Sequence, residues 1–289
     1  MAGPDKRRDG TGSRGSRLLG AGALLGVAAL VVLAFVVTDP DVRTHPTTGE
    51  EFGQFDAVRM LYLHVPMAVL MYAAFVVCAV ASVGVLLRRT AWWDVTAYAA
   101  AEVGTVLCGL VLVTGSIWGR PVWNTWWEWG DVRLMTTLVL FLLFVGYLAL
   151  RRTTADPRLQ ARRAAVVALV AVLDIPLINR SVAWWENRTL HQQSTLAELK
   201  FEDLTLFTLM FGFLVFGLVA WWILVHRFRV GWLEQAAIDH DVATALAERR
   251  SETSATDLDA AVGRWNDGED PVCPTRAIWW LGGASRWAC

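Results

Sequence analysis

The stretch Trp118–Arg133, WGRPVWNTWWEWGDVR, decides how the rest of the chain is read, because long apolar runs flank it on both sides. Five of the protein's 16 tryptophans lie between Trp118 and Trp129. Single tryptophans are common where a membrane helix meets water. Five in one short segment form a surface of aromatic faces, and such a surface favours a large, flat, apolar ligand over lipid alone.

Six apolar runs approach or exceed the roughly 20 residues that a membrane-spanning helix needs. The chain of 289 residues is 55% hydrophobic, with a mean hydropathy of +0.41. We therefore predict an all-α integral membrane protein, a bundle of six transmembrane helices. The fifth run is short and contains Asp174 and Pro176. The predicted spans are Leu18–Val37, Met60–Leu87, Val95–Ile117, Leu134–Leu150, Ala164–Ile178 and Leu204–Val225.

The basic residues between these runs predict the orientation, because loops that stay in the cytoplasm carry an excess of Lys and Arg. One side has 14 of them: Lys6, Arg7, Arg8, Arg14, Arg17, Arg88, Arg89, Arg151, Arg152, Arg158, Arg162, Arg163, Arg227 and Arg229. The other side has seven: Arg43, Arg59, Arg120, Arg133, Arg180, Arg188 and Lys200. Both termini are therefore predicted to be cytoplasmic, and the tryptophan-rich stretch to face outside.

Net charge and cysteine spacing exclude two classes of function. A net charge of −1 offers no basic field for the phosphates of a nucleic acid. The four cysteines show no C-x-x-C or other metal-binding spacing, so thiol chemistry is not expected.

Two histidines belong to the predicted outer face. His64, in the sequence RMLYLHVP, lies one turn inside the second run, where Pro66 is tolerated as a kink or first-turn residue. A histidine at a helix end is usually an interfacial residue, yet a polar ring within a membrane segment is a functional candidate by default. His191 lies in the loop after the fifth run, together with Trp184 and Trp185, and taken alone it is an ordinary loop histidine.

Haem matches this combination of residues. Its iron accepts axial imidazole nitrogen, its porphyrin faces stack on aromatic rings, and its propionates accept bidentate hydrogen bonds from arginine. Each feature alone is weakly specific, and their convergence on one face favours a haem site.

Three segments resemble the signature motifs of one family. The run GSIWGRPVWNTWWEWGDVRL resembles the WWD signature of haem-handling membrane proteins. The segments YLHVP and SVAWW…TLHQ resemble the two other marks of the CcmC family, a component of the multi-subunit cytochrome c maturation machinery. The resemblance covers about residues 55 to 225 and includes six spans in the same order.

The resemblance implies transient binding of haem b, with His64 and His191 as the axial ligands of the iron. It implies that the Trp118–Asp131 segment holds the porphyrin edge and that Arg59 and Arg133 bind the propionates. The residues expected to contact haem are His64, His191, Trp118, Trp123, Trp126, Trp127, Trp129, Asp131, Arg59, Arg133, Trp184 and Trp185.

The resemblance also implies the cellular setting. A protein of this family sits in the cytoplasmic membrane and hands haem, on the outer side, to a membrane-anchored haem chaperone (CcmE type). It works alongside ABC-type transporter subunits (CcmA and CcmB type) and a small membrane subunit (CcmD type). It is not expected to be an enzyme.

Two departures from the family pattern fall in loops, where insertions are tolerated. Gly130 is inserted before Asp131, and the sequence WWENRTLHQ is about two residues longer than the usual WWNTLHQ. They leave the histidine assignment intact, but Asp131 has an alternative, structural role as the N-cap of the fourth helix.

Outside the site, the sequence predicts a disordered tail over 1–17, a membrane domain over 18–229 and a cytoplasmic tail over 230–289 with an amphipathic helix, Leu233–Arg250. Glu102 and Asp174 are acids within predicted spans, for which pairing with another helix is as plausible as a function.

Three rival functions were weighed. A bis-histidine electron-transfer cytochrome would place its histidines inside the bilayer, whereas here only His64 lies in a span, at its edge. A haem-attaching cytochrome c synthetase of the same superfamily would have a larger outer domain and further membrane histidines. A permease without a cofactor explains the spans but not the tryptophans or the paired histidines.

Overall fold

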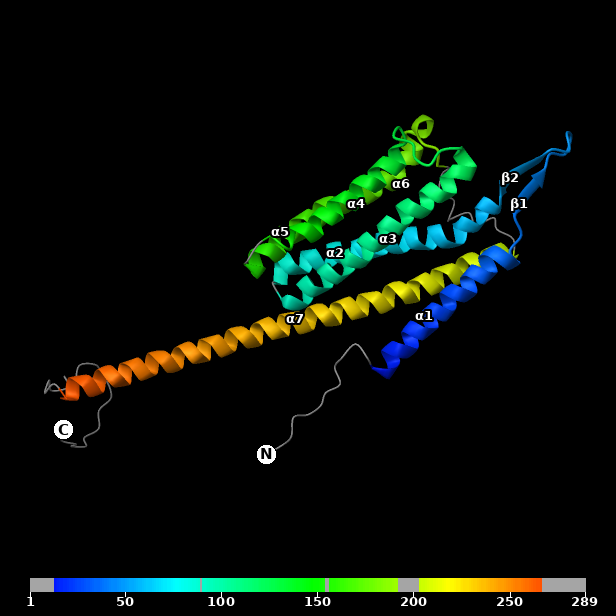
Figure 1. Ribbon diagram of the computed structural model, residues 1–289. Coiled ribbons are helices and arrows are strands. Elements are labelled where there is room, and N and C mark those ends of the chain that lie inside the picture. Colours follow the sequence, from blue (N-terminus) through cyan, green and yellow to red (C-terminus); the bar gives the residue numbers. More distant parts are fainter. Residues whose placement is uncertain (1–12, 89, 154–155, 192–202, 267–289) are drawn as a thin grey trace, which may run out of the picture. The chain divides into compact units, whose positions relative to one another are not determined.

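The computed structural model describes residues 13–88, 90–153, 156–191 and 203–266, and most of this part of the chain is α-helical (Figure 1). The helices are α1 (Arg14–Val32), α2 (Leu61–Arg88), α3 (Ala91–Trp123), α4 (Val132–Leu150), α5 (Pro157–Val172), α6 (Asp174–Trp184) and α7 (Asp203–Asn266). The shorter elements are a π-helical turn η1 (Leu33–Val37), the strands β1 (Asp41–Thr44) and β2 (Glu51–Phe55), and the 3-10 turns η2 (Asp56–Met60) and η3 (Glu186–Arg188).

Six helical segments of the described chain are long and apolar enough to cross a membrane, which confirms the predicted all-α, multi-pass membrane fold. These segments are Arg14–Val37, Asp56–Arg88, Ala91–Trp123, Val132–Leu150, Pro157–Trp184 and Leu204–Thr253.

The chain divides into two units, 1–234 and 235–289, although α7 is one continuous helix from Asp203 to Asn266. In the second unit, Ile238, Val242 and Leu246 are exposed and follow one another at four-residue spacing, as on one face of an amphipathic helix. Residues 1–12 and 267–289 lie outside the described residues, so the predicted tail boundaries stay predictions.

Aromatic side chains from neighbouring helices form the main core of the first unit. Phe75 of α2 stacks on Phe144 of α4 with ring centroids 3.8 Å apart, and both rings are fully buried. Gly104 of α3 makes room for this pair, because a Cβ there would lie 2.5 Å from the Phe75 ring. Small residues at helix contacts let the backbones approach closely, as is usual in membrane helix bundles.

A second cluster joins α1, α2 and α7 next to Pro66. Since proline has no N–H, Pro66 leaves the carbonyl of Tyr62 without its helical donor. Gly212 of α7 packs against that carbonyl, and a Cβ at Gly212 would lie 2.6 Å from the oxygen. The close approach of α7 therefore depends on glycine at this position.

The fifth span consists of two helices, α5 and α6, which meet at Leu173. Pro176 lies in the first turn of α6, where its missing N–H costs no helical hydrogen bond. The break between α5 and α6 therefore lies next to Asp174 and Pro176, the two residues that interrupt the apolar fifth run.

We call the end of the bundle that carries Arg88 and Arg151 the arginine end. Two bidentate ion pairs hold α3 to its neighbours there. Arg151 donates to both carboxylate oxygens of Asp94 at 2.7 Å. Arg227 of α7 donates to both oxygens of Glu102 at 2.6 Å. Glu102 is thus paired with a neighbouring helix, one of the alternatives that the sequence left open.

The opposite end of the bundle carries Trp118–Arg133, and we call it the tryptophan end. It has a β-hairpin that was not predicted from the sequence. Strands β1 and β2 pair antiparallel, with Arg43 opposite Phe52. Gly53 has a φ of 140°, and a Cβ there would lie 2.2 Å from the carbonyl oxygen of Asp41. The hairpin reaches α3 through Gln54, whose Oε1 accepts a hydrogen bond from Trp118 Nε1 at 3.0 Å.

Candidate functional site

The tryptophan-rich stretch is part helix and part loop. Helix α3 continues through Pro121 to Trp123, six residues beyond the predicted end of the third span at Ile117. Asn124 ends the helix in the left-handed conformation, and the Arg120 guanidinium donates to its backbone carbonyl at 2.7 Å. Trp118 and Trp123 are therefore fixed on a helix, whereas Trp126, Trp127 and Trp129 lie in the loop before α4.

His64 is held by α3. Its Nδ1 lies 2.9 Å from the hydroxyl oxygen of Thr114, and its ring meets Trp118 edge to face with centroids 5.6 Å apart. Gly115 packs beside the ring, because a Cβ there would lie 3.1 Å from Cε1. These contacts fix the plane of the imidazole, and the ring's hydrogen bond within the described residues is made by Nδ1 rather than Nε2.

His191 follows η3 in the loop after α6, and its ring lies 4.7 Å from that of Trp123. Burial lowers the pKa of His191 to about 3, helped by the positive charge of Arg133 and by His64, and opposed by Asp131. The imidazole is therefore neutral at physiological pH, the form that binds metals. Its Nδ1 is buried and has no hydrogen-bond partner among the described residues.

Asp131 joins the two loops of the tryptophan end. Its Oδ1 accepts from the backbone N–H of Leu134 at 2.9 Å and so caps α4. Its Oδ2 accepts from the backbone N–H of Leu190 at 2.6 Å, one residue before His191. The side chain is 1% exposed. Asp131 is therefore the N-cap of α4, the structural alternative that the sequence left open. The same carboxylate positions the loop that carries His191.

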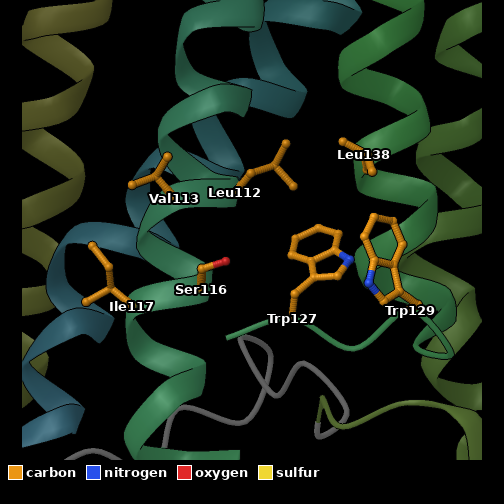
Figure 2. Close-up of a pocket in the computed structure, with 7 residues that line it drawn as sticks. All are labelled: Leu112, Val113, Ser116, Ile117, Trp127, Trp129 and Leu138. Carbon is orange, nitrogen blue, oxygen red and sulfur yellow. The ribbon is translucent and has the colours of Figure 1, made fainter. Parts of the chain in front are cut away.

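Two of the loop tryptophans, Trp127 and Trp129, line a groove of about 410 Å³ between α3 and α4. Figure 2 shows Trp127 and Trp129 at one end of this apolar groove, with the nitrogen edge of Trp127 turned toward Trp129. The two rings are edge to face at 6.0 Å. The groove is lined by Leu112, Val113, Ser116, Ile117, Trp127, Trp129 and Leu138.

The groove and His64 lie on different faces of α3. With 3.6 residues per turn, Thr114, Gly115 and Trp118 face His64, whereas Leu112 and Ser116 face the groove. Trp118 and Trp123 contact the histidines, and Trp127 and Trp129 line the groove. Trp126 is 60% exposed. Together with Trp123, Trp127 and Leu190 it lines a small cavity, so Trp127 borders both this cavity and the groove.

The two arginines predicted to bind propionates differ in their surroundings. Arg59 is engaged, since its guanidinium forms an ion pair with Asp56 at 3.0 Å and donates to the carbonyl of Phe35. Arg133 makes no hydrogen bond or ion pair with its guanidinium among the described residues, and its charge acts on His191. Arg133 is therefore the free cation beside the histidines in the described part of the chain.

Trp184 and Trp185 end α6 and contact one another edge to face at 5.8 Å. Their exposed fractions are 63% and 40%. No ring contact joins them to either histidine among the described residues, so the structure presents them as a separate exposed aromatic pair.

Three residues that contribute to this end were not predicted from the sequence: Thr114, Gln54 and Leu190. A signal existed for Thr114, which lies one helical turn before Trp118 and so shares its face. Gln54 and Leu190 form hydrogen bonds with residues far away in the sequence, and local sequence patterns do not predict such contacts.

Comparison with known proteins identifies the family. The profile of the family described as "CcmC: Heme exporter protein C" matches residues 15–243. The chain is 43% identical over 150 residues to heme exporter protein C of Bradyrhizobium diazoefficiens, covering 52% of this chain and 56% of the relative. It is 41% identical over 145 residues to the protein of that name from Escherichia coli K12, covering 50% and 58%.

The matched part thus spans little more than half the length of these two relatives. The match to heme exporter protein C of Haemophilus influenzae is longer, with 32% identity over 220 residues, 74% of this chain and 82% of the relative. On the extent of the profile match, the chain belongs to the CcmC (heme exporter protein C) family.

Proposed function

We propose that this protein binds haem b transiently at the outer face of the cytoplasmic membrane and delivers it to a membrane-anchored haem chaperone for cytochrome c maturation. In this proposal haem is a cargo, and the protein is a handling subunit rather than an enzyme. It works beside an ABC-type transporter and a small membrane subunit. The name of its relatives, heme exporter protein C, supports haem as the cargo.

One observation carries the proposal: two imidazoles from segments far apart in the sequence each lie against a tryptophan of α3, His64 against Trp118 and His191 against Trp123. Among the described residues no group of three or more His, Cys, Asp or Glu forms a metal site. Two imidazoles suit an iron whose other four ligands belong to a porphyrin.

The surroundings of the histidines fit a haem. The buried Nδ1 of His191 has no partner among the described residues, and leaving such a group unsatisfied is costly unless a ligand pairs with it. Arg133 offers a guanidinium for a propionate, and Trp118 and Trp123 offer apolar walls for the ring. Arg59 would bind a propionate only by sharing its guanidinium with Asp56, so we rank it behind Arg133.

The tryptophans are expected to divide into two functional groups. Replacing Trp118 and Trp123 with leucine should lower haem occupancy, because each ring contacts a histidine and each aromatic contact stabilises by about 0.5–1.5 kcal/mol beyond its buried area. Replacing Trp126 and Trp129, which are 60% and 71% exposed, should leave haem bound but impair its transfer to the chaperone. Haem per purified protein and chaperone loading measure the two effects.

If Trp126 and Trp129 are only interface anchors, the second pair of variants will show lower protein yield with normal haem content and normal loading. Equal loss of haem in both pairs would contradict the division into two groups.

The orientation rests on the 14-to-7 distribution of basic residues and gives a separate prediction. Single cysteines at Asn124 and Thr153, both exposed, mark the tryptophan end and the arginine end. In a chain whose four native cysteines are replaced, Asn124→Cys should react with a membrane-impermeant maleimide in intact spheroplasts, and Thr153→Cys only after lysis. The reverse pattern would place the proposed haem site in the cytoplasm and refute delivery on the outer side.

Haem transfer itself tests the function. Purified full-length protein loaded with ferric haem should lose its Soret absorption when the chaperone is added, while the chaperone gains haem. A protein that binds no haem, or that keeps it in the presence of a competent chaperone, would not be a donor.

A further inference from the structure

We propose that Thr114 is a positioning residue for the haem iron, because it holds His64 in the tautomer that is protonated at Nδ1 and leaves the Nε2 lone pair free for iron. The inference rests on the proposed haem-binding function, but the state of the imidazole is measurable without haem.

The Thr114 hydroxyl has a single proton to donate. The hydroxyl lies 2.8 Å from the carbonyl oxygen of Leu110 and 3.3 Å from that of Val111. A carbonyl oxygen only accepts hydrogen bonds. The hydroxyl proton is therefore directed to the α3 backbone, a common arrangement for threonine within a helix.

The hydroxyl oxygen can then act only as an acceptor toward His64. Its distance to His64 Nδ1 is 2.9 Å, a normal hydrogen-bond length. A neutral imidazole carries one N–H, so a proton on Nδ1 leaves Nε2 as the nitrogen with a lone pair. In histidine ligands, the hydrogen bond at one nitrogen decides which nitrogen binds the metal.

Packing keeps the ring from turning to exchange its nitrogens. Trp118 lies edge to face with the ring on the same face of α3, one turn after Thr114, and is itself held by Gln54 of the hairpin. The backbone of α3 passes close to the ring at Gly115, where a Cβ would lie 3.1 Å from Cε1. Thr114, Gly115 and Trp118 thus give His64 one orientation and one tautomer before any haem arrives.

His191 has no equivalent support. Its Nδ1 is buried without a hydrogen-bond partner among the described residues, and its ring contact is with Trp123. The two predicted axial ligands are therefore unequal. His64 is held in place by a side-chain hydrogen bond, whereas His191 depends on the position of its loop.

The test compares Thr114→Val, which keeps the shape but removes the acceptor, with Thr114→Ser, which keeps it. Thr105→Val is the matched control, since Thr105 is buried in α3 and donates to the carbonyl of Ala101 at 2.7 Å in the same way. The first measurement is 15N NMR of the haem-free, 15N-histidine-labelled full-length protein in lipid. The His64 signals are identified by their absence in His64→Gln.

The wild-type, Thr114→Ser and Thr105→Val proteins should show His64 protonated at Nδ1 alone. Thr114→Val should show a mixture of both tautomers. A wild-type His64 protonated at Nε2, or a Thr114→Val spectrum identical to wild type, would overturn the inference. The wild-type spectrum decides the point even if a variant does not fold.

The second measurement is titration with ferric haem. Loss of a hydrogen-bond partner behind a metal ligand typically lowers affinity 10–100-fold, so Thr114→Val should raise the Kd for haem by about that factor and Thr114→Ser should restore it. Unchanged affinity would remove Thr114 from the site. If the wild-type protein binds no haem, the proposed function fails, while the NMR result still decides the tautomer.

Discussion

Replacing His64 and His191 together with alanine is expected to abolish the low-spin haem spectrum of the purified protein. Two imidazole ligands make haem iron low-spin, and each single replacement opens one coordination position. The single variants should therefore show a high-spin component that added imidazole partly reverses. Because Thr114 hydrogen-bonds the His64 ring, whereas the buried Nδ1 of the His191 ring has no hydrogen-bond partner among the described residues, His64→Ala should lose the larger share of its haem.

The controls are histidines outside the site. His45 lies in the hairpin turn and accepts from the backbone N–H groups of Thr47 and Thr48, and His226 lies near the arginine end beside Ser16. Replacing either with alanine should leave the haem spectrum unchanged. A normal low-spin spectrum in the double variant would show that the iron ligands lie elsewhere.

Asp131→Ala is expected to behave as a loss of His191 combined with a loss of stability. The carboxylate caps α4 through Leu134 and holds the backbone N–H of Leu190. Losing a helix cap costs about 0.5–2 kcal/mol, and losing a hydrogen bond to a buried charged group costs about 1.5–3 kcal/mol. The free energy of unfolding should fall by about 3 kcal/mol, and the haem spectrum should resemble that of His191→Ala.

Asp156→Ala is the matched control, because Asp156 caps α5 in the same manner at the arginine end. That variant should lose about 1 kcal/mol, as expected for an exposed cap, and keep its haem spectrum. If Asp131→Ala kept a normal spectrum while losing the same stability as Asp156→Ala, Asp131 would be a cap alone, with no part in positioning His191.

The helical architecture could be predicted from the sequence, because membrane-spanning helices are recognisable as long apolar runs. Each predicted span has a helical counterpart, including the fifth, which is broken next to Asp174 and Pro176. The hairpin was not predicted, because its strands DVRT and EFGQF are short and their apolar residues, Val42, Phe52 and Phe55, do not alternate with polar ones. The extension of α3 was missed because Pro121 reads as a helix breaker, yet the helix continues through it to Trp123.

The site was accessible in part. Residue type and motif pointed to His64, His191 and the tryptophans, since imidazole and indole carry distinctive chemistry. The division of the tryptophans between the histidines and the groove was not predictable, because it depends on which face of α3 meets α2 and which meets α4. Thr114 was overlooked, because a threonine within an apolar helix usually bonds its own backbone and does nothing more.

The partners of the acidic residues within the spans could not be predicted from the sequence either. Glu102 pairs with Arg227, a partner that only the packing of α3 against α7 reveals. Asp174 has a buried oxygen without a partner among the described residues, and we assign it no role.

The most direct test of the central claim is magnetic circular dichroism of ferric haem bound to the wild-type, full-length protein, with haem counted per chain. We predict stoichiometric haem with the low-spin signature of two neutral imidazoles. A protein that retains no haem, or a haem with a high-spin, thiolate or methionine signature, would contradict it.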